Sequence, residues 1–197
     1  MAKTMSKEYV TTSSAEGIAA TVRAAKTKGL PPVHLWNPEF SGNLDMRIAR
    51  DGTWYYQGTS INRPELARLF STILKREGED YFLVTPVEKV GITVDDAPFV
   101  AVDFDTRGEA NAQELTFQTN MGDAVIAGPD NPIRVERRPQ TGEPSPYLMV
   151  RAGLEALVDR KSFYRLVDIG VHHQNWFGVW SGGAFFRMIP SDELKEG

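Results

Sequence analysis

Hydrophobic residues recur along the chain at two spacings, one typical of helices and the other typical of strands. The clearest helix is predicted over residues 62–78, where Leu66 and Phe70 belong to an apolar stripe with helical spacing. Asn62 and Glu65 have the spacing of a capping box, which satisfies backbone N–H groups at the start of a helix. The pattern therefore predicts a helix that packs one face against the rest of the fold.

Turn-forming residues divide the other hydrophobic runs into short elements. Asp51 and Gly52 suit a tight turn with positive φ and predict a hairpin between the flanking strands. Ser13 and Glu16 again have capping-box spacing, which predicts the start of a helix. The predicted order is helix 16–28, hairpin 45–58, helix 62–78, two strands within 81–95, hairpin 115–128, helix 149–160, strand 162–171 and hairpin 176–189.

This order repeats, since a hairpin, a helix and a strand follow one another in both halves of the chain. At an offset of 84 residues, Phe70 falls on Leu154 within the two predicted helices. At an offset of 70 residues, Gly52 falls on Gly122 within the two predicted hairpins. Any two amphipathic units share some spacing for physical reasons alone, but agreement in both element order and register favours a duplication.

The predicted fold class is α+β, with two packed modules built on a duplicated hairpin–helix–strand motif. The expected parts are an N-terminal helix and linker at residues 1–34, a first module at 35–104 and a second module at 115–190. The length of 197 residues suits two such modules, each small enough that a shared core is expected.

Composition narrows the class of protein. The chain is 41% hydrophobic and 24% charged, as ordinary globular proteins are. Its formal net charge of −4 argues against a broad basic surface for duplex nucleic acid. The sequence has no cysteine, which excludes disulfide frameworks, thiolate metal sites and cysteine nucleophiles. It also has no long apolar run and no signal-peptide core, so we expect a cytoplasmic location without a membrane partner.

The motifs of common enzyme classes are missing from the sequence. It has no phosphate-binding P-loop, dinucleotide-binding glycine motif, zinc-protease motif or serine-hydrolase elbow. Adjacent His172 and His173 would point to opposite faces of a strand, which argues against one shared metal ion. No cofactor is expected. The carboxylates of Asp95, Asp96 and Glu88 leave a Mg²⁺ site open, although turn capping explains such aspartates as well.

Arginine and aromatic residues give the other candidate chemistry. The planar guanidinium fork of Arg47, Arg134 or Arg151 suits a phosphate or a carboxylate, and an aromatic ring beside it suits stacking on a base. In a chain of negative net charge, such an anion site would be a local group of arginines rather than a basic face. The expected ligand-binding residues are Arg47, Trp54, Tyr56, Arg63, Thr85, Glu88, Lys89, Asp96, Arg134, Tyr147 and Arg151.

Several long segments resemble the DUF1285 family of uncharacterised proteobacterial proteins. The resemblance rests on the run DGTWYYQGTSINRPELARLF, on YFLVTPVEKVGITVDDAPF, and on the segments LTFQTNMGDAV, PYLMVRAGLEALVDRKSFYRLV and GVWSGGAFF. It implies a cytosolic fold of two parts with a repeated motif, and a C-terminal part superficially similar to pleckstrin-homology-like folds. It also implies a nucleotide-like ligand between the two parts and a role in signalling. It implies no catalytic activity and no catalytic residues.

Three functions are compatible with these observations. The favoured one is a non-enzymatic, regulatory protein of the signal-transduction type that binds a nucleotide-like or other anionic small molecule between its two modules. The second is a Mg²⁺-dependent phosphohydrolase or nucleotide-processing enzyme that uses Asp95, Asp96 and Glu88. The third is a protein-interaction scaffold that presents the proline-rich stretch at residues 129–146 to a protein partner.

Overall fold

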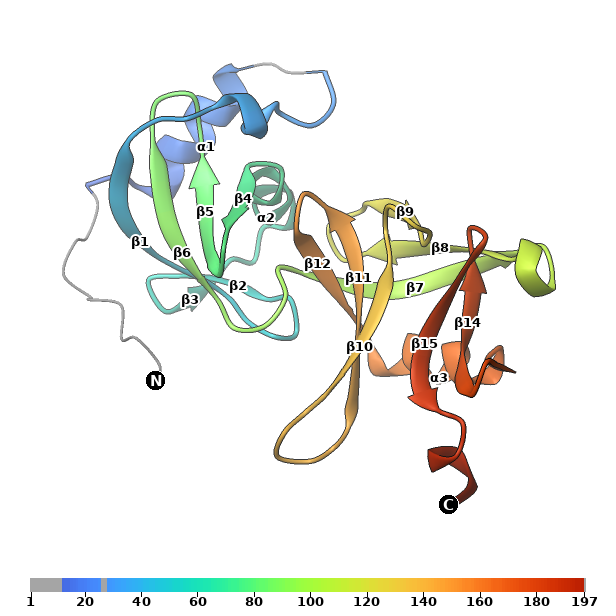
Figure 1. Ribbon diagram of the computed structural model, residues 1–197. Helices are drawn as coiled ribbons and strands as arrows, with labels where there is room; N and C mark the ends of the chain where they lie inside the picture. Colours follow the sequence, from blue (N-terminus) through green and yellow to red (C-terminus); the bar gives the residue numbers. More distant parts are fainter. Residues whose placement is uncertain (1–11, 26–27, 197) are drawn as a thin grey trace. The chain divides into compact units, whose positions relative to one another are not determined.

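The chain forms two compact units that meet in sequence between Asp96 and Ala97, here called unit 1 and unit 2 (Figure 1). The computed structural model describes residues 12–25 and 28–196. The start of the expected segment 1–34 and two residues of the predicted helix 16–28 therefore lie outside the described residues. The two-module α+β class is confirmed, with two six-stranded sheets and one further sheet of three strands among the described residues. The expected first module ran to residue 104, which lies inside the first strand of unit 2.

Unit 1 is built on one six-stranded sheet with two α-helices. In the middle of the sheet, β1 and β6 pair in parallel, while the other neighbouring strands are antiparallel. The strand order across the sheet is β3-β2-β1-β6-β5-β4. The elements are α1 (Ala15–Ala24), the 3₁₀-helix η1 (Val33–Leu35), β1 (Phe40–Ile48), β2 (Trp54–Tyr56), β3 (Thr59–Ser60), α2 (Pro64–Ser71), β4 (Leu74–Glu77), β5 (Asp80–Val84) and β6 (Lys89–Val94).

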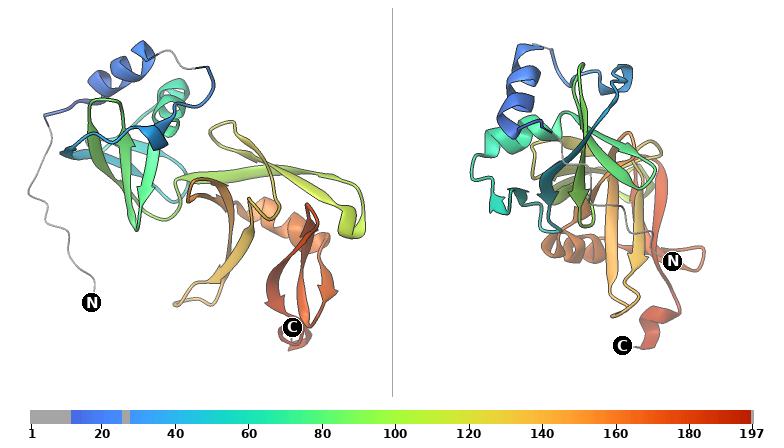
Figure 2. Two further views of the ribbon diagram at one scale, coloured as in Figure 1. Left: turned by 45° about the horizontal axis from the view of Figure 1, so that its top comes forward. Right: turned by 90° about the vertical axis from the view of Figure 1, so that its left-hand side faces the viewer.

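Unit 2 has a second six-stranded sheet, which bends strongly (Figure 2), and a smaller sheet next to it. The strand order is β10-β11-β12-β7-β8-β9 in the large sheet and β13-β14-β15 in the small one. The elements are β7 (Phe99–Arg107), η2 (Ala110–Ala112), β8 (Glu114–Thr119), β9 (Ala124–Ile126), β10 (Ile133–Arg137), β11 (Pro144–Arg151), β12 (Leu154–Val158), α3 (Arg160–Asp168), β13 (Val171–His173), β14 (Trp176–Ser181), β15 (Ala184–Pro190) and η3 (Glu193–Glu196).

The repeat is present in the topology of the two large sheets. In each sheet the first strand of the unit pairs in parallel with the sixth, β1 with β6 and β7 with β12. Counted from its own first strand, each sheet then has the same order, 3-2-1-6-5-4. α2 lies between the third and fourth strands of unit 1, whereas α3 follows the sixth strand of unit 2. The duplicated unit is thus the sheet, and the helices differ in position.

The residue matching predicted for this repeat is wrong. The offset of 84 residues placed the helical residue Phe70 on Leu154, which begins β12. The predicted helix 149–160 is instead the end of β11, a turn and β12, and the predicted strand 162–171 is mostly α3. Ala152 and Gly153 have φ values of 45° and 78°, so the chain reverses direction there instead of continuing a helix.

The predicted helix 62–78 is also shorter than expected. α2 ends at Ser71, and Arg63 takes the N-cap position without a side-chain hydrogen bond, so the expected capping box of Asn62 and Glu65 is not formed. Ile73 and Leu74 are buried although they follow the helix. The apolar spacing therefore runs past the end of α2, because Ile73, just before β4, and Leu74, the first residue of β4, are buried in the core as well.

Other sequence predictions are confirmed. The hairpins expected at 45–58, 115–128 and 176–189 are the antiparallel pairs β1–β2, β8–β9 and β14–β15. The two strands within 81–95 are β5 and β6. Gly52 has a φ of 86° in the first of these turns, which explains why glycine suits this position. In the first helix the cap is Ser14, whose side chain accepts a hydrogen bond from the Gly17 N–H, and not Ser13 as expected.

The core of unit 1 is formed around two stacked aromatic rings. Trp54 from β2 is 2% exposed and Phe70 from α2 is fully buried, with ring centroids 6.1 Å apart and an angle of 25° between the rings. This stacking holds α2 against the sheet, and α2 in turn contacts α1. No helix among the described residues is long and apolar enough to cross a membrane.

Candidate functional site

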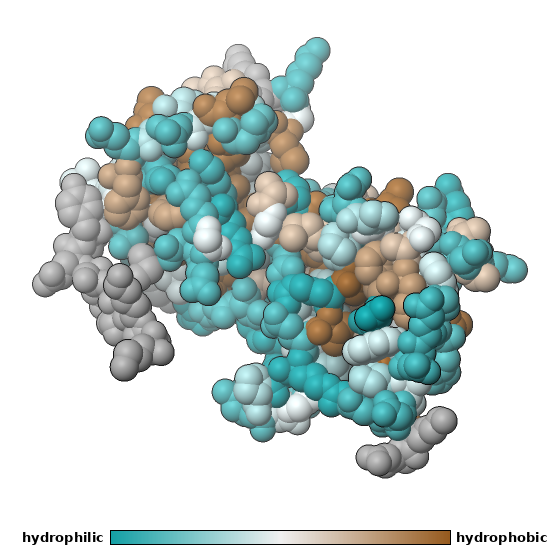
Figure 3. All heavy atoms as spheres, viewed as in Figure 1, coloured by the Kyte–Doolittle hydropathy of each residue, from teal (hydrophilic) through white to brown (hydrophobic). Residues whose placement is uncertain are grey.

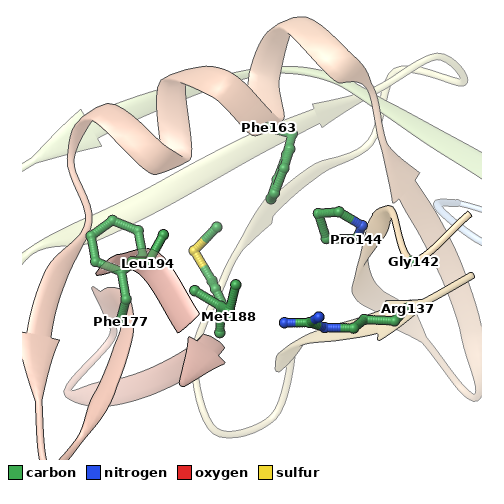
Figure 4. Close-up of a pocket in the computed structure, with 8 residues that line it drawn as sticks. Arg137, Gly142, Pro144, Phe163, Phe177, Met188 and Leu194 are labelled. Atoms are coloured by element: carbon green, nitrogen blue, oxygen red, sulfur yellow. The ribbon is translucent and has the colours of Figure 1, made fainter. Parts of the chain in front are cut away.

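Unit 2 contains a cavity of about 240 Å³ next to the bent sheet. Most of its walls are hydrophobic, and Figure 4 shows side chains from several elements pointing into one space. Viewed as in Figure 1, hydrophobic atoms are visible between β10 and β15 and are bordered by hydrophilic ones (Figure 3). The lining residues are Arg137, Gly142, Pro144, Phe163, Phe177, Met188, Ile189 and Leu194.

The first turn of α3 positions Phe163, which forms one wall of the cavity. The side chain of Asp159 accepts a hydrogen bond from the Ser162 N–H at 2.7 Å, which fixes the first turn of the helix. Ser162 and Leu166, one helical turn apart, are the buried residues that hold α3 on the sheet. Phe163 then projects from the helix into the cavity (Figure 4).

The small sheet supplies the opposite wall through Phe177 on β14 and Met188 on β15. A β-carbon at Gly170 would lie 2.2 Å from the Phe177 ring, so glycine is required there for the ring to take its place. The ring of His172 contacts Phe177 edge-on with centroids 5.3 Å apart, and His172 Nδ1 lies 2.8 Å from Ser191 Oγ. These contacts hold the Phe177 ring in place.

Arg137 is the only charged residue among the described residues that line the cavity. Arg137, the last residue of β10, forms an ion pair with Glu193 of η3. The two side chains are 50% and 44% exposed. Leu194, the next residue, lines the cavity and is 42% exposed. The result is an apolar space with one guanidinium at its rim, an arrangement that suits a small molecule with an apolar body and one anionic group.

Arg47 of β1, the first predicted arginine, is held by a carboxylate within unit 1. Its Nε donates to both carboxylate oxygens of Asp95, at 2.9 and 3.0 Å, and its Nη2 donates to Oδ2 at 2.7 Å. These hydrogen bonds hold the pKa of Asp95 below its usual value. The guanidinium also lies over the ring of Tyr55, 5.3 Å from its centroid. Arg47 thus joins β1 to the segment after β6.

The depressed pKa of Asp95 gives a prediction for acid stability. Stabilisation from this pair is fully present above the ordinary aspartate pKa of 3.8 and is lost as the pH falls through the lower folded-state pKa. We expect Asp95→Asn to reduce the difference in melting temperature between about pH 6 and about pH 2. Asp130→Asn, at an exposed loop aspartate, is the control and should keep the wild-type pH dependence. Equal pH dependence in Asp95→Asn and the wild type would contradict the prediction.

The other two arginines of the predicted anion site lie in unit 2 and have carboxylate partners as well. Arg134 donates to Glu155 through Nε at 2.6 Å and through Nη2 at 2.7 Å, and its guanidinium lies 4.4 Å from the ring centroid of Tyr147. Glu155 raises the pKa of Arg134 above its usual value, chiefly through these hydrogen bonds. Arg151 donates to Asp123 at 3.0 Å. Arg134 thus contacts Tyr147, another of the candidate ligand-binding residues, but its hydrogen bonds go to a carboxylate of the chain itself.

The remaining predicted residues all lie in unit 1 and take part in its internal contacts. Thr85 is buried, and its hydroxyl accepts from the Glu88 N–H at 3.1 Å in the turn between β5 and β6. Lys89 pairs with Glu77 at 3.0 Å. Trp54 belongs to the core, Arg63 is the N-cap residue of α2, and half-buried Tyr56 lies on β2.

The three acids of the predicted Mg²⁺ site have separate partners. Asp95 binds Arg47, Asp96 pairs with Arg50, and Glu88 accepts from the Ser13 hydroxyl. Across the residues that the structure describes, no group of three or more His, Cys, Asp or Glu side chains could hold a metal ion.

None of the cavity residues was among the predicted ligand-binding residues. The cavity joins six elements, from β10 to η3. Five of its residues (Phe163, Phe177, Met188, Ile189 and Leu194) are apolar residues that a sequence pattern assigns to a core. Arg137 has no distinguishing signal in the sequence, because Arg134, Glu136 and Arg138 make the whole segment rich in charge.

Comparison with known proteins places both units in one family. The model of the DUF1285 N-terminal domain, a domain of unknown function, matches residues 31–97, and that of the DUF1285 C-terminal domain matches residues 98–188. The chain belongs to the DUF1285 family. The boundary between the two DUF1285 matches lies one residue from the boundary between unit 1 and unit 2.

Two solved DUF1285 structures are similar to this chain. The crystal structure of a DUF1285 family protein from Silicibacter pomeroyi DSS-3 is 62% identical, with a TM-score of 0.86 over 91% of this chain and 98% of that one. A DUF1285 family protein from Shewanella baltica OS155 is 31% identical, with a TM-score of 0.50 over 64% of this chain and 91% of that one. Among curated proteins, the comparison found no match.

Proposed function

We propose that this DUF1285 protein is a non-enzymatic, regulatory binding protein whose ligand occupies the cavity of unit 2. The observation that carries the proposal is a mainly apolar cavity of about 240 Å³ with the guanidinium of Arg137 at its rim. Pockets for drug-sized ligands usually have roughly 300–1,000 Å³, so this one suits a smaller molecule with a single ring or a short chain. The cytoplasmic location and the signalling role expected from the sequence belong to the same proposal.

The partners of the arginines favour Arg137 as the anion-binding group. Arg134 makes two hydrogen bonds to Glu155, whose side chain is only 11% exposed, so a ligand would have to replace a well-shielded internal pair. The pair of Arg137 with Glu193 is about half exposed on both sides. Exposed ion pairs contribute only about 0–1 kcal/mol, so an anionic ligand can exchange with Glu193 at little cost.

A series of probes with one apolar body and different head groups tests this function. Isothermal titration calorimetry with octanoate, octan-1-ol and octylammonium separates the apolar contribution from that of the charge. We expect octanoate to bind most tightly and octylammonium most weakly, because the rim of the cavity carries a guanidinium. AMP and ATP in the same titrations test whether nucleotide-like molecules belong to the ligand class.

A matched pair of variants locates the binding. Arg137→Met keeps the length of the side chain and removes its charge, and we expect octanoate affinity to fall about tenfold. Arg138→Met removes the same charge from the next residue, which is outside the cavity lining, and should leave the affinity unchanged. If none of octanoate, AMP and ATP binds the protein, or if Arg137→Met and Arg138→Met both bind octanoate like the wild type, the proposed function is wrong.

A further inference from the structure

The C-terminal end of the described chain places two different groups at the cavity of unit 2. Glu193 brings a carboxylate to Arg137, and Leu194 brings an apolar side chain to the cavity wall. They are consecutive residues, so one short segment presents an anion and an apolar body together. These are the two features that the cavity itself would select in a ligand.

The C-terminal segment is anchored up to Ser191 and is weakly held beyond it. The Ser191 N–H donates to the Asn175 carbonyl at 3.0 Å, and the Ser191 hydroxyl lies 2.8 Å from His172 Nδ1, which ties the end of β15 to β13 and to the turn after it. Beyond Ser191 comes η3, a 3₁₀-helix of 4 residues. A single helical turn has little stability of its own, so its place depends on contacts with the rest of unit 2, and among the described side chains these are made by Glu193 and Leu194.

Those two contacts are of the kind that is easily exchanged. The Arg137–Glu193 pair is exposed to solvent on both sides, and Leu194 keeps 42% of its surface exposed while lining the cavity. For the side chains that the structure describes, releasing the segment therefore costs one exposed ion pair and the burial of about half a leucine side chain. An incoming ligand that supplies a better anion and more apolar contact can displace both.

We propose that Glu193 and Leu194 act as an internal competitor for the cavity, and that its ligand is a carboxylate with a short apolar chain or a single ring. This inference rests on the proposed binding function and adds the ligand class and the regulation of the same site. The carboxylate of the ligand takes the place of Glu193 on Arg137, and its apolar body takes the place of Leu194. Binding thus releases η3 from unit 2.

The competition has a measurable consequence for affinity. The apparent dissociation constant equals the intrinsic one divided by the fraction of molecules in which the segment is released. Weakening either contact raises that fraction and so tightens binding. We expect Glu193→Gln to lower the octanoate dissociation constant by about two- to fivefold, the range that an exposed ion pair supports. Leu194→Ala should lower it by about threefold.

Asp192→Asn is the matched control. It removes the same charge from the residue next to Glu193, but Asp192 does not line the cavity. We expect the octanoate dissociation constant of Asp192→Asn to equal that of the wild type. ¹³C-methyl NMR of leucine gives a second readout, because octanoate should move the Leu194 methyl signals toward the positions of a solvent-exposed leucine while octylammonium leaves them in place.

The outcomes separate this inference from the proposed function. Tighter octanoate binding in Glu193→Gln and Leu194→Ala, with release of the Leu194 methyl groups, supports both. Octanoate binding that depends on Arg137 but is unchanged or weakened in these two variants overturns the internal competitor and leaves the binding function in place. If octanoate, AMP and ATP bind neither the wild type nor Glu193→Gln, the proposed function fails and the inference fails with it.

Discussion

Phe70→Ala is expected to destabilise unit 1 by about 3–5 kcal/mol, the usual cost of removing a large aromatic side chain from a core. Phe70 is fully buried, and its ring stacks on Trp54 with centroids 6.1 Å apart. The substitution leaves an apolar hole between α2 and the sheet, where rigid strands limit collapse around it. Amide hydrogen exchange in β1 and β6 measures the loss within unit 1 directly, because those amides exchange through unfolding of its central strand pair.

Phe40→Ala is the matched control for this effect. Phe40 is 47% exposed and touches Phe82 edge-on at 6.1 Å, so the same truncation should cost about 1 kcal/mol. Equal losses in Phe40→Ala and Phe70→Ala would show that the stacked pair does not organise the core of unit 1.

Arg134→Met is expected to destabilise unit 2 by about 2 kcal/mol. Glu155 is 9% exposed, and the substitution leaves its carboxylate without the guanidinium that makes two hydrogen bonds to it. Breaking a fully buried pair costs about 3–5 kcal/mol, and this value is reduced because the Arg134 side chain is 42% exposed. Urea denaturation followed by tryptophan fluorescence, with hydrogen exchange in β11 and β12, measures the change.

The double variant Arg134→Met/Glu155→Leu decides whether this pair serves structure or binding. Removing both charges leaves no buried carboxylate unpaired, because Glu136, the other partner of Arg134, is 63% exposed, so most of the lost stability should return. We also expect the double variant to bind octanoate like the wild type, because the cavity rim keeps Arg137. Recovery of stability together with loss of octanoate binding would assign the anion site to Arg134 instead.

The sequence predicted the elements whose signals are local. Hairpins with a glycine in the turn were placed correctly, as Gly52 shows in β1–β2, because turn geometry depends on a few adjacent residues. The segment from β11 to β12 was mistaken for a helix. β12 is buried at Leu154, Glu155 and Ala156 in succession, so the alternation typical of a half-exposed strand is missing. The capping residue Asp159, which marks the true helix, lay inside the mispredicted segment.

The candidate site could not be predicted for a different reason. Residue type correctly marks arginine as able to bind an anion, but it does not show which arginines already bind a carboxylate of the chain itself. The partner of Arg47 is 48 residues away in sequence, and Glu155, the buried partner of Arg134, is 21 residues away. The cavity depends on the same kind of long-range information, since its walls come from segments that only the bent sheet and α3 bring together.

The parallel pair in the middle of each large sheet has a consequence for how the protein is made. The ribosome delivers β1 first and β6 last, so the strands β1, β2 and β3 and the strands β4, β5 and β6 assemble as two separate halves. They join along one seam only after β6 has left the exit tunnel. A translation pause before Lys89 therefore leaves the long edge of β1 open to pairing with another nascent chain, and β7 meets the same risk until β12 arrives.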